Sequence, residues 1–159
     1  MISRIMKNLD VLVVSFCVIT LSAVGKILTE MGMDWYNTLN LPSLTPPSWV
    51  FGAVWTILYI LAACAAIILM RAYKHVGYYR TVLGFFLLLV ILNPLWSYLF
   101  FVEHSIAAAL LDIIIMEFTL ATIIFYAWED ARTIALLMLP AALWVAFALY
   151  LNYQMLLLN

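Results

Sequence analysis

Three rows of aromatic rings, accompanied by amide or hydroxyl groups, recur at helical spacing in the sequence. In the first row, Phe51, Trp55 and Tyr59 are four residues apart, which places their side chains on one face of a helix, one above another. Two further rows combine a large ring with small or amide residues: Asn93 and Ser97 with Trp96 between them, and Trp144, Ala148 and Asn152. A cavity walled by such rows would suit a large, planar, apolar ligand.

The same rings also allow a purely structural interpretation. Aromatic residues at helical spacing in membrane proteins often fill helix contacts or form the interfacial belt. An indole N–H deep in hydrocarbon needs an acceptor that lipid does not supply, so we expect Trp55, Trp96 and Trp144 to face the interior. Asn93 would be costly if it faced lipid, and it either bonds to another helix or contacts a ligand.

Two carboxyl side chains, Asp112 and Glu117, lie within an otherwise apolar stretch. A carboxylate inside a membrane is a functional candidate because its burial is expensive. The two residues are five apart, about 140° around a helix, so they do not form a pair on one face. A structural role, with hydrogen bonds to other helices, and a role in proton-coupled transport both stay open.

The composition indicates that the segments carrying these residues lie in a membrane. Of 159 residues, 69% are hydrophobic and 9% charged, whereas soluble domains carry roughly 25% charged residues. The seven basic residues are scattered, which argues against a nucleic-acid partner. Cys17 and Cys64 have no histidine or carboxylate at ligand spacing, so no metal site is expected.

Several uncharged runs exceed the roughly 18 apolar residues that mark a membrane-spanning helix. We therefore predict an all-α integral membrane bundle of five transmembrane helices that forms a single domain over residues 1–159. The expected helices cover about residues 6–28, 47–70, 81–102, 105–128 and 133–156. Pro94 is expected to kink the third helix near its middle.

The distribution of Lys and Arg predicts the orientation of the bundle. With the N-terminus inside, the inner segments hold six basic residues and the outer ones only Lys26. The six are Arg4, Lys7, Arg71, Lys74, Arg80 and Arg132. The long loop over residues 29–46 then lies outside. Uniformly helical spans favour an inner, or cell, membrane of a bacterium over an outer membrane built of barrels.

Three motifs support a family resemblance over essentially the whole chain. They are WYNTLNLPSLTPPSWVFGAVWTILY, NPLWSYLFF and LPAALWVAFALYLNYQMLLLN. In this order and spacing the sequence resembles the translocator protein family, also called the tryptophan-rich sensory protein (TspO/MBR) family. The resemblance implies a five-helix bundle, usually a homodimer, that binds porphyrins such as protoporphyrin IX and haem. The porphyrin would be a ligand, and no cofactor would be required.

Carried over by position, the resemblance implies a ligand site drawn from the three rows and the outer loop. The implied ligand-binding residues are Tyr36, Phe51, Trp55, Tyr59, Asn93, Trp96, Ser97, Trp144, Phe147 and Ala148. The resemblance also implies light-dependent breakdown of protoporphyrin IX, with Trp55 and Trp144 reacting with the excited or oxidised porphyrin. Tyr36 would belong to a lid formed by residues 29–46.

The sequence therefore leaves three functional hypotheses open, and all three require the same ligand pocket. The protein would be a tetrapyrrole sensor or carrier, or it would degrade bound porphyrin in light. The alternative is a proton-coupled transporter of a small apolar or lipid-like substrate, with Asp112 or Glu117 taking up the proton.

Overall fold

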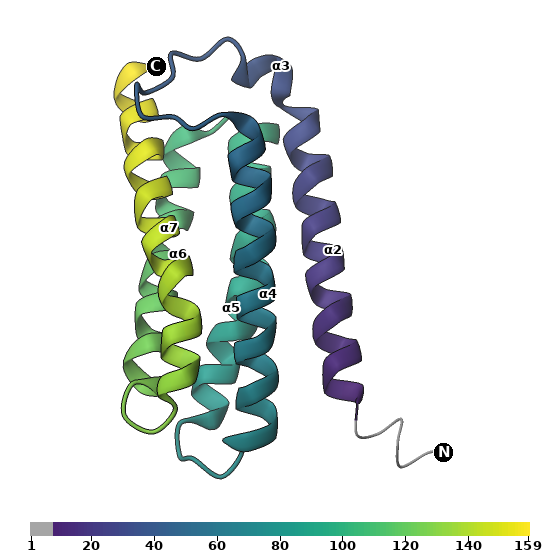
Figure 1. Cartoon of the computed structure of the whole chain (residues 1–159). Coiled ribbons are helices and arrows are strands. Elements are labelled where there is room, and N and C mark those ends of the chain that lie inside the picture. The colour runs from purple at the N-terminus through teal and green to yellow at the C-terminus, as the bar shows by residue number, and fades with distance from the viewer. Residues whose placement is uncertain (1–7) are drawn as a thin grey trace.

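The computed structural model describes residues 8–159, and the expected helix start near Met6 lies outside this range. Helices and short connections make up the described chain (Figure 1). The helices are α2 (Leu9–Met31), α3 (Met33–Tyr36), α4 (Ser48–Ala72), α5 (Tyr79–Ser97), the π-helix η1 (Tyr98–Val102), α6 (Ile106–Ala127) and α7 (Arg132–Leu158). The α5–η1 unit forms one continuous span.

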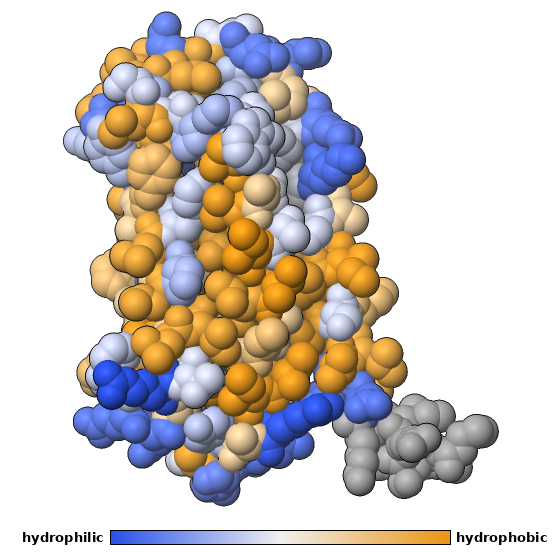
Figure 2. All heavy atoms as spheres, viewed as in Figure 1, coloured by the Kyte–Doolittle hydropathy of each residue, from blue (hydrophilic) through white to orange (hydrophobic). Residues whose placement is uncertain are grey.

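Five of these helical spans are long and apolar enough to cross a membrane. On the face in view, Figure 2 shows a broad hydrophobic band, with hydrophilic residues gathered at the two ends of the molecule. An apolar outer surface of this kind is stable against lipid and unstable against water. The protein is therefore an integral membrane bundle, which confirms the fold class expected from the sequence.

The boundaries of the helices differ from the sequence expectation mainly at the C-terminal ends of α2 and α5. The first helix continues to Met31, and the short helix α3 follows it, so the expected loop over residues 29–46 is partly helical. In α5, α-helical structure continues past Pro94 to Ser97, and the irregular segment is η1, one turn later. A π-helical turn accommodates a local disturbance in hydrogen bonding without ending the helix.

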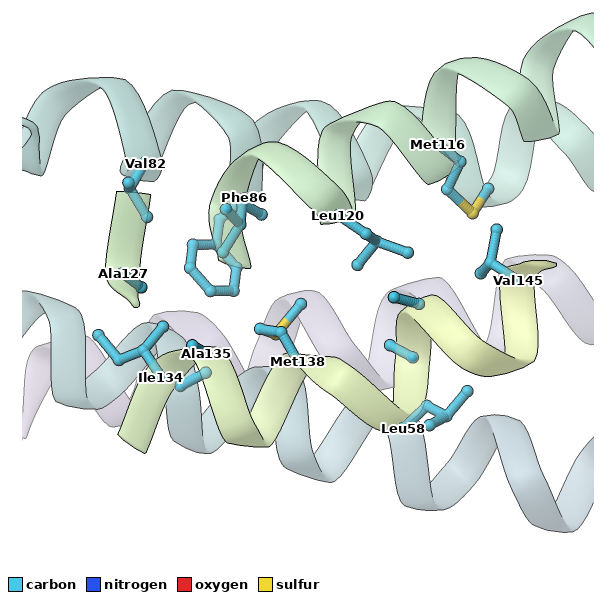
Figure 3. Close-up of a cluster of buried hydrophobic side chains, with 14 of the residues drawn as sticks. Leu58, Val82, Phe86, Met116, Leu120, Ala127, Ile134, Ala135, Met138 and Val145 are labelled. Carbon is cyan, nitrogen blue, oxygen red and sulfur yellow. The ribbon is translucent and has the colours of Figure 1, made fainter. Parts of the chain in front are cut away.

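The most deeply buried part of the bundle lies along α6 and α7, which pack against each other and against α5 and α4. Small residues permit this close packing, as they do in other membrane bundles: Ala109, Ala127 and Ala135 are completely buried. Between them, larger side chains interdigitate, and Figure 3 shows Met116 of α6 and Val145 of α7 pointing toward one another.

The first helix, α2, is a peripheral element in which no residue is buried. Polar or close contacts hold it near both ends. At one end, Asp10 pairs with Arg71 of α4, with the Arg71 Nη2 2.9 Å from the Asp10 Oδ1. At the other end, Gly32 is buried against the backbone of Phe101 in η1. Between these ends, half-buried residues such as Val14, Val18 and Leu21 recur at helical spacing, and α2 packs on α4 and α5.

The segment between α2 and α4 is bound to the end of the bundle at which the C-terminus lies (Figure 1). Trp35 stacks on His104, with ring centroids 4.3 Å apart. The Asn40 backbone N–H donates to the Asn159 side chain at 2.9 Å, and the Asn159 amide donates back to the Asn40 carbonyl at 3.2 Å. These contacts join the segment over residues 29–46 to the connection between η1 and α6 and to the C-terminal end of α7.

Replacing Gly32 by alanine is expected to destabilise the protein. A Cβ at this position would lie 2.7 Å from the Phe101 Cα and closer still to its carbonyl group, and overpacking of this kind costs about 1–3 kcal/mol. The matched control is Gly25→Ala in the same region, where nothing lies within 4 Å of the added Cβ. Thermal unfolding in detergent measures both, and a Gly32→Ala midpoint equal to that of the control would contradict this account.

Candidate functional site

A hydrogen bond between two helices lies at the centre of the candidate site. The Tyr59 hydroxyl of α4 donates to the Asn93 Oδ1 of α5 at 2.9 Å. The Asn93 amide in turn lies 3.9 Å from the Met116 sulfur of α6, a weak acceptor. Asn93 therefore bonds across helices, one of the two possibilities left open by the sequence, and it connects three helices at one level.

Aromatic rings extend from this hydrogen bond toward the N-terminal end of α4. Trp55 packs on Tyr59 with ring centroids 5.5 Å apart. One turn further on, Phe51 makes an edge-to-face contact with Trp144 of α7 at 5.7 Å, and Trp144 contacts Phe147 at 5.6 Å. We call these five residues, Phe51, Trp55, Tyr59, Trp144 and Phe147, the aromatic cluster. The structure thus brings the predicted residues of α4 and α7 together.

The indole N–H of Trp144 is the unusual group of the aromatic cluster. Its nitrogen is buried, and no described residue offers it an acceptor. An unmade hydrogen bond of this kind costs about 1–3 kcal/mol. The indole therefore presents an unused donor at the contact of α4 with α7, next to flat ring surfaces.

Trp96 shows the opposite arrangement. Its indole N–H donates to the Asn152 Oδ1 of α7 at 3.1 Å, and the Asn152 amide donates to the Ile106 carbonyl of α6 at 3.0 Å. Asn152 is 2% exposed, and its side-chain amide joins α7 to α5 and α6 through these two hydrogen bonds. The sequence placed it in the third row but not among the site residues, and its four-residue spacing from Ala148 was the available signal.

A second group of rings, at the end of the bundle that holds the C-terminus, consists of Tyr36, Phe100 and Phe101. We call it the outer ring group, after the membrane side on which the orientation expected from the sequence would place Tyr36. The Tyr36 ring packs at 5.8 Å from Phe101 and 6.2 Å from Phe100 of η1, and Trp96 stacks on Phe100 at 5.1 Å. Burial raises the pKa of the Tyr36 hydroxyl, so this group keeps its proton and can donate a hydrogen bond. Phe100 and Phe101 each contact both Tyr36 and Trp96 and so connect these two rings; Phe100 was not singled out from the sequence.

The two small residues of the predicted site lie inside the bundle. Ser97 is buried on α5, 9% exposed, and Ala148 is half-buried against the main hydrophobic core. Neither adds a ring, and both let neighbouring helices or a ligand approach closely. The predicted residues of α5 therefore stand between the aromatic cluster and the outer ring group.

The carboxyl side chains of α6 differ in burial. Asp112 is 4% exposed, and neither of its oxygens has a partner among the described residues. Glu117 is less buried, and one of its oxygens, Oε2, is likewise without a described partner. Within residues 8–159, no group of three or more His, Cys, Asp or Glu side chains is placed to hold a metal ion. The candidate site as a whole thus offers the flat rings of the aromatic cluster, the Trp144 N–H donor and the Tyr59–Asn93 pair.

Comparison with known proteins agrees with this architecture. The family model described as the TspO/MBR family matches residues 13–158. A tryptophan-rich protein TspO of Archaeoglobus fulgidus is 34% identical over 89% of this chain and 92% of its own. The protein of the same name from Chlorobaculum tepidum is 34% identical over 96% and 99%.

A tryptophan-rich sensory protein of Cereibacter sphaeroides is 32% identical over 79% of this chain and 77% of its own. The family match covers all five spans, including the helices that carry the aromatic cluster and the outer ring group. The chain therefore belongs to the TspO/MBR family.

Proposed function

We propose that the protein binds a planar tetrapyrrole, such as protoporphyrin IX or haem, at the aromatic cluster and acts as a membrane sensor or carrier for it. The observation that carries this proposal is the buried Trp144 N–H without an acceptor, placed among rings of α4 and α7. A tetrapyrrole offers a flat apolar surface for the rings and polar atoms for the donor. The name of the Cereibacter sphaeroides relative, a sensory protein, favours the sensor role.

In this proposal the segment over residues 29–46, the lid segment, regulates access to the site. Tyr36 packs on η1 rather than on the aromatic cluster, so the lid closes the outer end of the bundle above Trp96. A ligand would enter when these ring contacts and the Asn40–Asn159 hydrogen bonds open. The ligand then reaches the Trp144 donor from the outer face.

Replacing Trp144 by phenylalanine is expected to weaken binding of protoporphyrin IX about fivefold, because a neutral hydrogen bond contributes about 1 kcal/mol. The phenyl ring preserves most of the contact with Phe51. Trp49→Phe is the matched control, since Trp49 is 74% exposed. Binding is read from the porphyrin absorption band in nanodiscs in the dark. Equal affinities of both variants and the wild type would remove Trp144 from the site.

A second candidate function is light-dependent breakdown of the bound porphyrin, with molecular oxygen as the oxidant. The ring contacts of Trp55 and Trp144 favour it, because both indoles adjoin the surface on which a porphyrin would lie. At saturating protoporphyrin IX, illumination should bleach the absorption band in the wild type and in Trp49→Phe. Bleaching should be lost in Trp55→Phe and Trp144→Phe. Bleaching at the wild-type rate in both variants would refute the photochemical role.

We also propose that the protein is a homodimer in a bacterial cell membrane with its N-terminus inside. Four basic residues support the orientation, because the α4–α5 and α6–α7 connections lie at the same end of the bundle (Figure 1). They are Arg71, Lys74, Arg80 and Arg132. Lys26 lies toward the other end of α2 and pairs with Glu30 at 3.7 Å.

Cysteine labelling measures this orientation directly. In a background with Cys17 and Cys64 replaced by alanine, Ser43→Cys should react with an impermeant maleimide in intact spheroplasts. Gly77→Cys should react only after the membrane is permeabilised, because it lies in the basic connection between α4 and α5. Both positions are exposed, so each is the other's control. The reverse pattern would place the N-terminus outside.

A further inference from the structure

Asp112 has an environment that does not tolerate a negative charge. It is 4% exposed about two turns into α6, and neither carboxyl oxygen has a partner among the described residues. An isolated buried carboxylate costs far more than a buried carboxylic acid, so such a group takes up a proton instead. The neutral acid still lacks a hydrogen-bond acceptor for that proton.

The helices that pack on α6 supply no counter-charge at this level. These elements are α5, η1 and α7. The charged residue of α5 is Arg80 and that of α7 is Arg132, both at the opposite end of their helices. Along each helix they lie about 20–25 Å from the level of Asp112, at 1.5 Å per residue. After η1, Glu103 is exposed and accepts the Tyr98 hydroxyl, and His104 is exposed and stacks on Trp35. On α6 itself, Glu117 is another acid.

Helix register places Asp112 one turn from the candidate site. Asn93 of α5 contacts Met116 of α6, and the two helices are antiparallel, so Ser97 lies opposite Asp112. On α7, the Asn152–Ile106 hydrogen bond and the pairing of Met116 with Val145 bring the apolar residues between Val145 and Leu149 to this level (Figure 3). Ser97 is thus the polar neighbour that the register offers.

From this arrangement we propose that Asp112 is an intramembrane proton-binding site, occupied while α5, α6 and α7 are closely packed, and that its occupancy is coupled to ligand binding beside it. If Asp112 lost its proton, the carboxylate would need a hydrogen-bond donor. That donor would be the Ser97 hydroxyl or water that enters between α5 and α6. That rearrangement would move the turn that carries Asn93 and its bond to Tyr59. The coupling, unlike the proton site itself, rests on the proposed tetrapyrrole function.

The sign of the coupling follows from linkage. If the ligand binds best to the closely packed, protonated bundle, affinity is full at low pH and falls as Asp112 loses its proton. One linked proton changes the dissociation constant by at most about tenfold per pH unit. Asp112→Asn has the shape of the neutral acid and no titration, so its affinity should stay at the low-pH value.

Infrared spectroscopy tests the proton site without any ligand. Wild-type protein in nanodiscs should show the carbonyl band of a protonated carboxylic acid at neutral pH, with a shift in D2O. Asp112→Asn should lack this band, whereas Glu117→Gln should keep it. A band that is unchanged in Asp112→Asn, or absent from the wild type, would overturn the proposal. If Asp112→Asn did not assemble, the presence or absence of the band in Glu117→Gln alone would decide.

Titration with protoporphyrin IX at increasing pH tests the coupling. The propionates of the porphyrin titrate equally with every variant, so the difference between wild type and Asp112→Asn isolates the protein group. Affinity that falls with pH in the wild type and in Glu117→Gln but not in Asp112→Asn supports the coupling. Identical pH profiles would refute it while leaving the infrared result standing. Absence of binding in all proteins would refute the tetrapyrrole function and, with it, the coupling.

Discussion

The structure depends on one constraint: a polar side chain inside a membrane must find its partner within the protein. The Tyr59–Asn93 bond joins α4 to α5, and the Trp96–Asn152–Ile106 chain joins α5, α7 and α6. Apolar packing alone distinguishes poorly between lipid and another helix, because both surfaces are hydrocarbon. These few hydrogen bonds therefore fix the register in which the aromatic rings meet.

Where the constraint is not met, the structure points to function. Trp144 of α7 and Asp112 and Glu117 of the neighbouring helix α6 have buried polar atoms that lack described partners, and Asp112 is the carboxyl group with neither oxygen paired. Buried polar groups are almost always satisfied in native proteins, so exceptions call for an explanation. A ligand acceptor for the indole and a proton on the carboxyl would supply what the described residues do not. A buried polar group that has a partner in the protein is thus assigned a structural role, and one that lacks a partner is a candidate for a functional role.

Much of the fold could be predicted because membrane burial leaves a strong signal in hydropathy. The five spans and the inward tryptophans follow from spacing and the cost of unpaired groups. For Asn93 the same cost left two alternatives, a cross-helix bond or a ligand contact, and the structure shows the bond. The π-helix η1 could not be predicted, because it is local geometry at a close contact with Gly32. Likewise, spacing could place Trp96 and Trp144 inside but could not show that only the first has an acceptor, since Asn152 reaches it from another helix.

The central claim is that the aromatic cluster and its free indole donor form a tetrapyrrole site. The most direct measurement is an equilibrium titration of the wild-type protein in nanodiscs with protoporphyrin IX in the dark, with empty nanodiscs beside it. The account predicts saturation at one porphyrin per chain, with quenching of tryptophan fluorescence. Uptake that rises linearly and matches the empty nanodiscs would mean that the porphyrin only partitions into lipid, and it would contradict the account.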